Sequence, residues 1–152
     1  MSSDHEHDDD RPRLLLAEDD DELRSLLELA LSEDFHVVSM EDRLELLDYL
    51  ELSRARPPRA KPPDVILSDL CMPGGAGLEL LEQIRELGFS GPIGLMSAFA
   101  DPETARRAIS KGANFFVDKP LDVDDLIVKV KGLLEVRRAQ AGASDEAEAA
   151  GR

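Results

Sequence analysis

Short apolar runs alternate with longer amphipathic segments along most of this chain, and this alternation limits the fold more than any other feature. Five runs are short enough to be buried strands, and a segment with helical spacing of its apolar residues follows each. The predicted strands are residues 14–17, 36–39, 65–68, 92–96 and 114–117. Strands that alternate with helices form parallel sheets, and right-handed crossovers place the helices on both faces. The sequence therefore predicts an α/β fold, a three-layer sandwich around a five-stranded parallel sheet.

The amphipathic segments carry apolar residues three and four positions apart, as a helix with one buried face requires. Asp20 or Asp21 can cap the first helix, and Asp101 before Pro102 predicts the start of the fourth. Gly88 suits the end of the third helix. The other helices are expected at residues 42–52, 77–87 and 123–138. The buried positions expected in the first two are Leu23, Leu26, Leu27, Ala30 and Leu31, then Leu44 and Leu47 with Leu50 or Leu52.

Charge and composition divide the chain into one folded domain, residues 12–138, and two tails. The acidic residues 1–11 and the Ala-rich residues 139–152 lack apolar periodicity, so both are expected to be disordered. The segment 53–63 is rich in proline and basic residues and is expected to be an exposed loop, because proline is excluded from helix and strand interiors. The net charge of -15 disfavours direct binding to nucleic acid.

Two further absences in the sequence bear on location. No apolar run approaches the roughly 18 residues of a membrane span. Cys71 is the only cysteine, which excludes an internal disulfide and fits a reducing compartment. We therefore expect a cytoplasmic protein without a membrane span.

Polar side chains follow four of the predicted strands at the point where each strand ends. They are Glu18 with Asp19, then Asp69, Ser97 and Lys119. Taken singly, each has an ordinary explanation, such as acids at a helix start, a turn residue or a surface lysine. Ligands of open parallel sheets bind outside the carboxyl ends of the strands, so polar residues on successive strand ends indicate one site.

The residue types at these strand ends indicate phosphoryl chemistry. Three neighbouring carboxylates repel one another unless a cation neutralises them, and all-oxygen ligation favours Mg²⁺, Mn²⁺ or Ca²⁺. One carboxylate can attack phosphorus as a nucleophile, while a hydroxyl and an ammonium hold the other phosphoryl oxygens.

Four stretches carry a resemblance to a known family: LLLAEDDDELRSLL, DVILSDLCMPGGAGLELL, GPIGLMSAFAD and GANFFVDKPLDVDDL. Over about residues 13–137 the chain resembles the receiver domain of bacterial two-component response regulators. The resemblance implies the flavodoxin-like strand order 2-1-3-4-5. It also implies a phosphoprotein of a phosphorelay, which carries an aspartyl phosphate and catalyses its own phosphorylation and dephosphorylation.

The resemblance assigns a role to each strand-end residue. Asp69 would be the phosphoacceptor, and Lys119 would pair with Asp69 first and with a phosphoryl oxygen later. The expected ion is Mg²⁺, with Mn²⁺ as an alternative, and its expected ligands are Glu18, Asp19, Asp69 and the backbone carbonyl of Cys71.

Further positions would transmit or time the signal. Ser97 would be the switch hydroxyl, Phe116 the aromatic switch residue, and the bond to Pro120 would be cis. The apolar side chains of Cys71 and Phe99 orient water poorly, which predicts slow autodephosphorylation. Glu18, Ser97 and Phe116 stand where the family more often has Asp, Thr and Tyr, but each departure keeps the catalytic groups.

The resemblance also implies partners. A histidine kinase or a histidine phosphotransfer protein would donate the phosphoryl group, and a downstream protein effector would read the face formed by residues 98–131. A phosphorylation-dependent dimer is a further expectation, and the chain is expected to be a stand-alone receiver without an output domain.

Two alternatives remain open from the sequence. One is a protein-binding module on the same fold that works without phosphorylation. The other is a phosphatase of the haloacid dehalogenase type, which requires a second Asp where this chain has Cys71.

Overall fold

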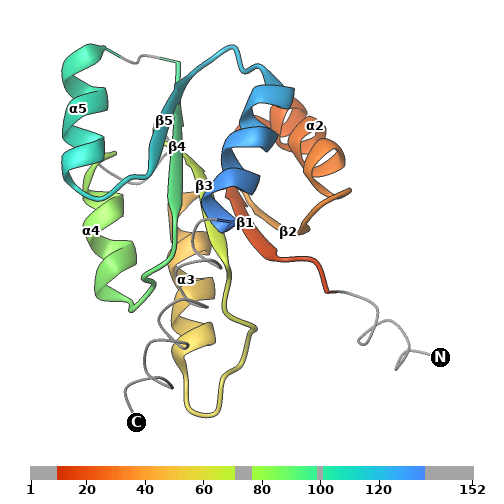
Figure 1. Ribbon diagram of the computed structural model, residues 1–152. Coiled ribbons are helices and arrows are strands. Elements are labelled where there is room, and N and C mark those ends of the chain that lie inside the picture. The colour runs from red at the N-terminus through yellow and green to blue at the C-terminus, as the bar shows by residue number, and fades with distance from the viewer. Residues whose placement is uncertain (1–9, 71–76, 99–100, 136–152) are drawn as a thin grey trace, which may run out of the picture.

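A parallel sheet of five strands forms the centre of the molecule (Figure 1). The computed structural model describes residues 10–70, 77–98 and 101–135. The strands run in the order β2-β1-β3-β4-β5, with every neighbouring pair parallel. This confirms the predicted sheet and its order. The strands are β1 (Arg13–Ala17), β2 (His36–Met40), β3 (Val65–Asp69), β4 (Ile93–Ser97) and β5 (Phe115–Asp118).

Helices cover both faces of the sheet, which confirms the three-layer sandwich (Figure 1). One face packs against α2 (Asp21–Leu31) and against a C-terminal helix described over residues 123–135. The other face packs against three helices, α3 (Arg43–Arg54), α4 (Glu79–Glu86) and α5 (Pro102–Ser110). Among the described residues, no helix has the length and apolar character needed to cross a bilayer.

The central strands have no polar face. Leu14, Leu15 and Leu16 of β1 are all fully buried, and Leu15 belongs to one core cluster while Leu14 and Leu16 belong to the other. A parallel strand covered by helices on both sides has this continuous apolar pattern. The polar residues that follow such a strand are therefore the first ones able to serve a site.

The buried face of α3 differs from the expected one. Leu44 is 67% exposed and Leu46 is buried in its place, whereas Leu50 is buried as expected. Arg43 is also buried, and its Nε donates a hydrogen bond to Gln83 Oε1 on α4 at 2.9 Å. Leucines at several neighbouring positions allow more than one helix face, and the packing against α4 selects between them.

The ends of the helices follow the local signals with small shifts. Asp20 caps α2 by accepting from the backbone N–H of Leu23, and Asp101 caps α5. Gly88 follows α4 with a φ of 90°, a left-handed conformation that glycine adopts without steric cost. Leu26 of α2 is 53% exposed, contrary to expectation, because the stripe that packs on the sheet is narrow. Two further shifts concern α3, which continues to residue 54, inside the expected loop, and α4, which begins at residue 79.

Candidate functional site at the strand ends

Residues from distant parts of the sequence meet at the carboxyl-terminal edge of the sheet. Glu18 follows β1, Asp69 ends β3, Ser97 ends β4 and Lys119 follows β5. These strands are neighbours in the order β1-β3-β4-β5, and the register pairs Asp69 with Met96, the residue before Ser97. Parallel pairing therefore brings the predicted strand-end residues to one edge.

Glu18, Asp19 and Asp69 form a carboxylate cluster. Each contributes one oxygen, and these oxygens all lie within 4.8 Å of one another. Glu18 is fully buried and Asp69 is 4% exposed, whereas Asp19 faces solvent. Like charges so close together in a desolvated position destabilise one another, so the cluster requires positive charge nearby.

Lys119 supplies one positive charge. Its Nζ lies 2.6 Å from Glu18 Oε1 and 2.8 Å from Asp69 Oδ2. Its backbone N–H donates to the Ser97 carbonyl at 2.9 Å, and the bond from Lys119 to Pro120 is cis. The ammonium therefore joins the ends of β1 and β3 from beyond β5.

The pKa values of Glu18 and Lys119 reflect both their burial and their contact with each other. Burial raises the pKa of Glu18 above 4.5, although hydrogen bonds from Lys119 and from the backbone N–H of Asp20 oppose the rise. Burial alone would lower the pKa of Lys119, but hydrogen bonds to Asp69 and Glu18 outweigh it and raise that pKa above 10.5. Lys119 is therefore a cation at neutral pH, whereas Glu18 takes up a proton more readily than an exposed glutamate.

The donor set fits a hard divalent cation. Three carboxylates carry more negative charge than the single ammonium of Lys119 neutralises. All the donors are oxygens, which Mg²⁺ prefers, and the exposed Asp19 leaves one side open to water or to a phosphate oxygen. The residues present are therefore able to hold Mg²⁺.

Arg24 on α2 supports this cluster, although the sequence analysis did not single it out. Its Nη1 donates to the backbone carbonyl of Glu18 at 2.8 Å, and its Nη2 lies 2.5 Å from Asp21 and 3.5 Å from Glu41. Glu41 follows β2, so this largely buried guanidinium ties the ends of two strands together and fixes the backbone that carries the acids. An arginine six residues after Glu18 was the available signal, but its contact with a carbonyl is visible only in three dimensions.

Ser97 and Phe116 occupy the positions expected of the two switch residues. Ser97 is 1% exposed at the end of β4. Phe116 is half-buried on β5, where it pairs with Leu95, and its ring borders a hollow of about 420 Å³ with Ala105 and Ile109 of α5. The ring therefore has open space beside it. The roles expected of both residues stay predictions.

Two expected residues lie outside the described part of the chain. They are Cys71, whose carbonyl is an expected metal ligand, and Phe99, which with Cys71 was expected to slow dephosphorylation.

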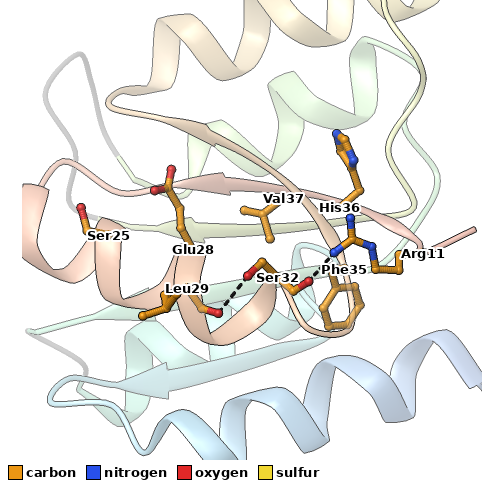
Figure 2. Close-up of a pocket in the computed structure, with 8 residues that line it drawn as sticks. All are labelled: Arg11, Ser25, Glu28, Leu29, Ser32, Phe35, His36 and Val37. Atoms are coloured by element: carbon orange, nitrogen blue, oxygen red, sulfur yellow. Dashed lines mark hydrogen bonds between the residues drawn. The ribbon is translucent and has the colours of Figure 1, made fainter. Parts of the chain in front are cut away.

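A separate groove lies beside the outermost strand β2, between β2 and α2 (Figure 2). Ser32 Oγ donates to the Leu29 carbonyl at 2.9 Å, and the guanidinium of Arg11 donates to the Ser32 carbonyl. Figure 2 shows the charged ends of Arg11 and Glu28 at opposite ends of the groove. The labelled side chains do not converge on one point, so the strand ends remain the candidate site.

Known proteins are similar to this chain in both fold and sequence. The transcriptional regulatory protein CseB of Streptomyces coelicolor is 34% identical over 143 residues, which cover 93% of this chain and 57% of CseB. A signal receiver domain of a putative LuxO repressor protein from Vibrio parahaemolyticus matches with a TM-score of 0.76 and 25% identity, over 88% of this chain and 97% of that one. The beryllofluoride-activated receiver domain dimer of NtrC4 matches with a TM-score of 0.70 and 26% identity, over 81% and 96%. The chain thus spans little more than half the length of CseB.

A sequence model of one family covers most of the chain. The family is described as the response regulator receiver domain, and the match runs over residues 14–131. That range contains β2 to β5 in full, all of β1 except Arg13, and each strand-end residue described above. The chain therefore belongs to the receiver-domain family of two-component response regulators.

Proposed function

We propose that this receiver domain accepts a phosphoryl group on Asp69 from a phosphohistidine and then changes a protein-interaction face. The observation that carries the proposal is the position of the Asp69 carboxylate, which is buried, beside Glu18 and Asp19, and 2.8 Å from the ammonium of Lys119. The donor would be a histidine kinase or a histidine phosphotransfer protein, since receiver domains act with such partners.

In the proposed reaction a carboxylate oxygen of Asp69 attacks phosphorus. A P–O bond forms, the P–N bond to the donor imidazole breaks, and the electron pair of that bond leaves with the imidazole nitrogen. Mg²⁺, the ion that receiver domains generally use, would neutralise charge on the phosphoryl oxygens when bound to Glu18, Asp19, Asp69 and the Cys71 carbonyl.

Lys119 and Ser97 complete the proposed reaction site. The Lys119 ammonium already contacts Asp69, so it needs only a small movement to reach a phosphoryl oxygen attached to that carboxylate. Ser97 ends the strand beside Asp69, and its hydroxyl can donate to another phosphoryl oxygen. Both contacts hold charge beside the buried carboxylates of Glu18 and Asp69.

Phosphorylation would then alter the surface around α5 and β5. When Ser97 turns toward the phosphoryl group, it vacates space on its other side. The ring of Phe116, which borders a hollow beside α5, can then move into that vacated space. We assign effector binding to the face formed by residues 98–131. The beryllofluoride-activated NtrC4 receiver dimer supports a phosphorylation-dependent dimer of this chain. Cys71 and Phe99, both poor at orienting water, would prolong the phosphorylated state.

A beryllofluoride experiment tests the proposal. Wild-type protein, Asp69→Asn and the surface control Asp48→Asn are mixed with Mg²⁺ and beryllofluoride, and the adduct is followed by ¹⁹F NMR. We expect an adduct in the wild type and in the control, dependent on Mg²⁺, and none in Asp69→Asn. An equal adduct in Asp69→Asn, or none in the wild type, would refute the proposal and favour a module that works without phosphorylation.

A further inference from the structure

The last residue of α3 and the loop that joins this helix to β3 concentrate positive charge in an acidic protein. Arg54, Arg56, Arg59 and Lys61 are all exposed, and residues 53–63 contain no acid. The whole chain has 33 acidic residues and a net charge of -15. Residues 53–63, called the basic loop below, therefore differ in charge from the chain as a whole.

Hydrogen bonds and prolines hold the backbone of the basic loop in place. The backbone N–H of Arg59 donates to the Leu52 carbonyl at 2.9 Å, and the Tyr49 hydroxyl donates to the Lys61 carbonyl at 2.7 Å. Prolines follow at 57, 58, 62 and 63, and each fixes its own φ. A charged surface on a restrained backbone loses little conformational entropy when a partner binds.

In the part of the chain that the structure describes, the side chains of the basic loop have no acidic partner. Within the described residues none of its four cations forms an ion pair with a carboxylate, and Arg54 contacts only the backbone carbonyl of Glu86, at 3.3 Å. Other surface lysines do have acidic partners: Lys111 pairs with Glu82, Lys129 with Asp125 and Lys131 with Asp34. The basic loop therefore presents available charge.

The loop lies far from the phosphoacceptor. It leads into the first residue of β3, whereas Asp69 is the last, and Figure 1 shows the loop projecting beyond the end of α3. Five strand residues span about 16 Å. A partner on this loop would therefore leave the strand-end site and the 98–131 face accessible.

We propose that the basic loop docks a short acidic segment of a partner polypeptide. Asp and Glu side chains match four exposed cations, and arginine binds carboxylates with paired hydrogen bonds. A short segment fits better than a long polyanion, because the acidic remainder of the surface repels DNA, which carries about one charge per 1.7 Å, and also repels anionic membranes. This proposal does not depend on phosphorylation of Asp69.

A binding experiment with a matched charge control tests the proposal. The probe is a fluorescein-labelled octaglutamate peptide, with octaglutamine as the neutral peptide, in 20 mM salt. The test variant replaces Arg54, Arg56, Arg59 and Lys61 with Ala, and the control variant replaces Arg11, Arg137, Arg138 and Arg152 with Ala. Each lowers the net charge by four, and the control positions lie outside the basic loop, the strand-end site and the 98–131 face. Circular dichroism verifies that both variants are folded.

We expect octaglutamate to bind the wild type and the control variant, and to bind the test variant about tenfold or more weakly, since four exposed ion pairs are lost together. Binding should weaken as salt is raised. The proposal is overturned if octaglutamate does not bind the wild type, or if both variants lose binding equally. It is also overturned if single-stranded DNA or phosphatidylserine vesicles bind the wild type more tightly than octaglutamate does.

Discussion

The strand-end site and the basic loop use the same residue types under opposite conditions. At the strand ends Lys119 is 16% exposed and contacts two carboxylates, whereas Lys61 on the loop is exposed and has no acidic partner among the described residues. Burying a charged group costs free energy, so each buried charge needs an oppositely charged neighbour, and that contact contributes to the stability of the fold. An exposed charged group keeps its hydration, so it needs no partner within the protein and is available to another molecule.

The largest difference is expected between Lys119→Met and Lys61→Met. Lys119→Met leaves the buried Glu18 and the nearly buried Asp69 without their cation, so we expect it to lower the free energy of unfolding by about 3 kcal/mol in EDTA. Lys61→Met should change it by less than about 0.5 kcal/mol. Urea denaturation at pH 7 measures both.

Adding Mg²⁺ separates the charge effect from loss of packing. A bound cation replaces the missing ammonium, so Mg²⁺ should recover part of the stability of Lys119→Met and bind to it more tightly than to the wild type. If the two lysine variants were equally stable in EDTA, burial would not distinguish the two regions.

A smaller difference is expected between Arg24→Gln and Arg56→Gln. Arg24 donates to the Glu18 carbonyl and contacts two acids, and its loss should cost about 1–2 kcal/mol of stability. Because Arg24 fixes the backbone of two proposed Mg²⁺ ligands, its replacement should also weaken Mg²⁺ binding, measured by isothermal titration calorimetry.

Stability alone does not identify a positioning role, so a third variant is needed. Arg24→Lys keeps the charge but cannot reach the carbonyl and both acids at once, and it should fall between the wild type and Arg24→Gln in Mg²⁺ affinity. Arg56→Gln should leave Mg²⁺ affinity unchanged. An unchanged affinity in Arg24→Gln would limit the role of this arginine to stability.

The two regions also differ in how far the sequence predicts them. The alternation of short apolar runs with amphipathic segments predicted the parallel sheet. Because the carboxyl ends of parallel strands lie at one edge of the sheet, this topology also predicted that Glu18, Asp69 and Lys119 lie together. In α3 the sequence predicted the burial of Leu50 but placed Leu44 inside where the structure has Leu46, because leucines at neighbouring positions allow more than one helix face. Arg43 is also buried on this side, where it bonds to Gln83 of α4. Arg24 was missed for a similar reason, since its partner is a backbone carbonyl that has no sequence signature.

The pH dependence of stability should distinguish the buried acid from exposed ones. The pKa of Glu18 is raised above 4.5 in the folded protein, so the folded state binds more protons than the unfolded state as pH rises from that value. Glu18 therefore reduces stability progressively from pH 4.5 up to its raised pKa. In EDTA, thermal melts should show Glu18→Gln gaining on the wild type across that interval. Saturating Mg²⁺ should favour the wild type instead, since the variant lacks one carboxylate ligand.

The smallest expected effect tests whether the basic loop is held or merely exposed. Tyr49→Phe removes only the hydroxyl that donates to the Lys61 carbonyl, at a cost of about 0.5–1 kcal/mol. Hydrogen exchange should quicken at amides of residues 59–61 while the strand-end amides keep their rates. Ser53→Ala is the control, because the hydrogen bond of Ser53 to the Leu50 carbonyl lies within α3 and does not reach the loop. If octaglutamate binding weakens in Tyr49→Phe but not in Ser53→Ala, the restrained backbone contributes to docking as well as the charge; if both variants bind like the wild type, charge alone accounts for the affinity.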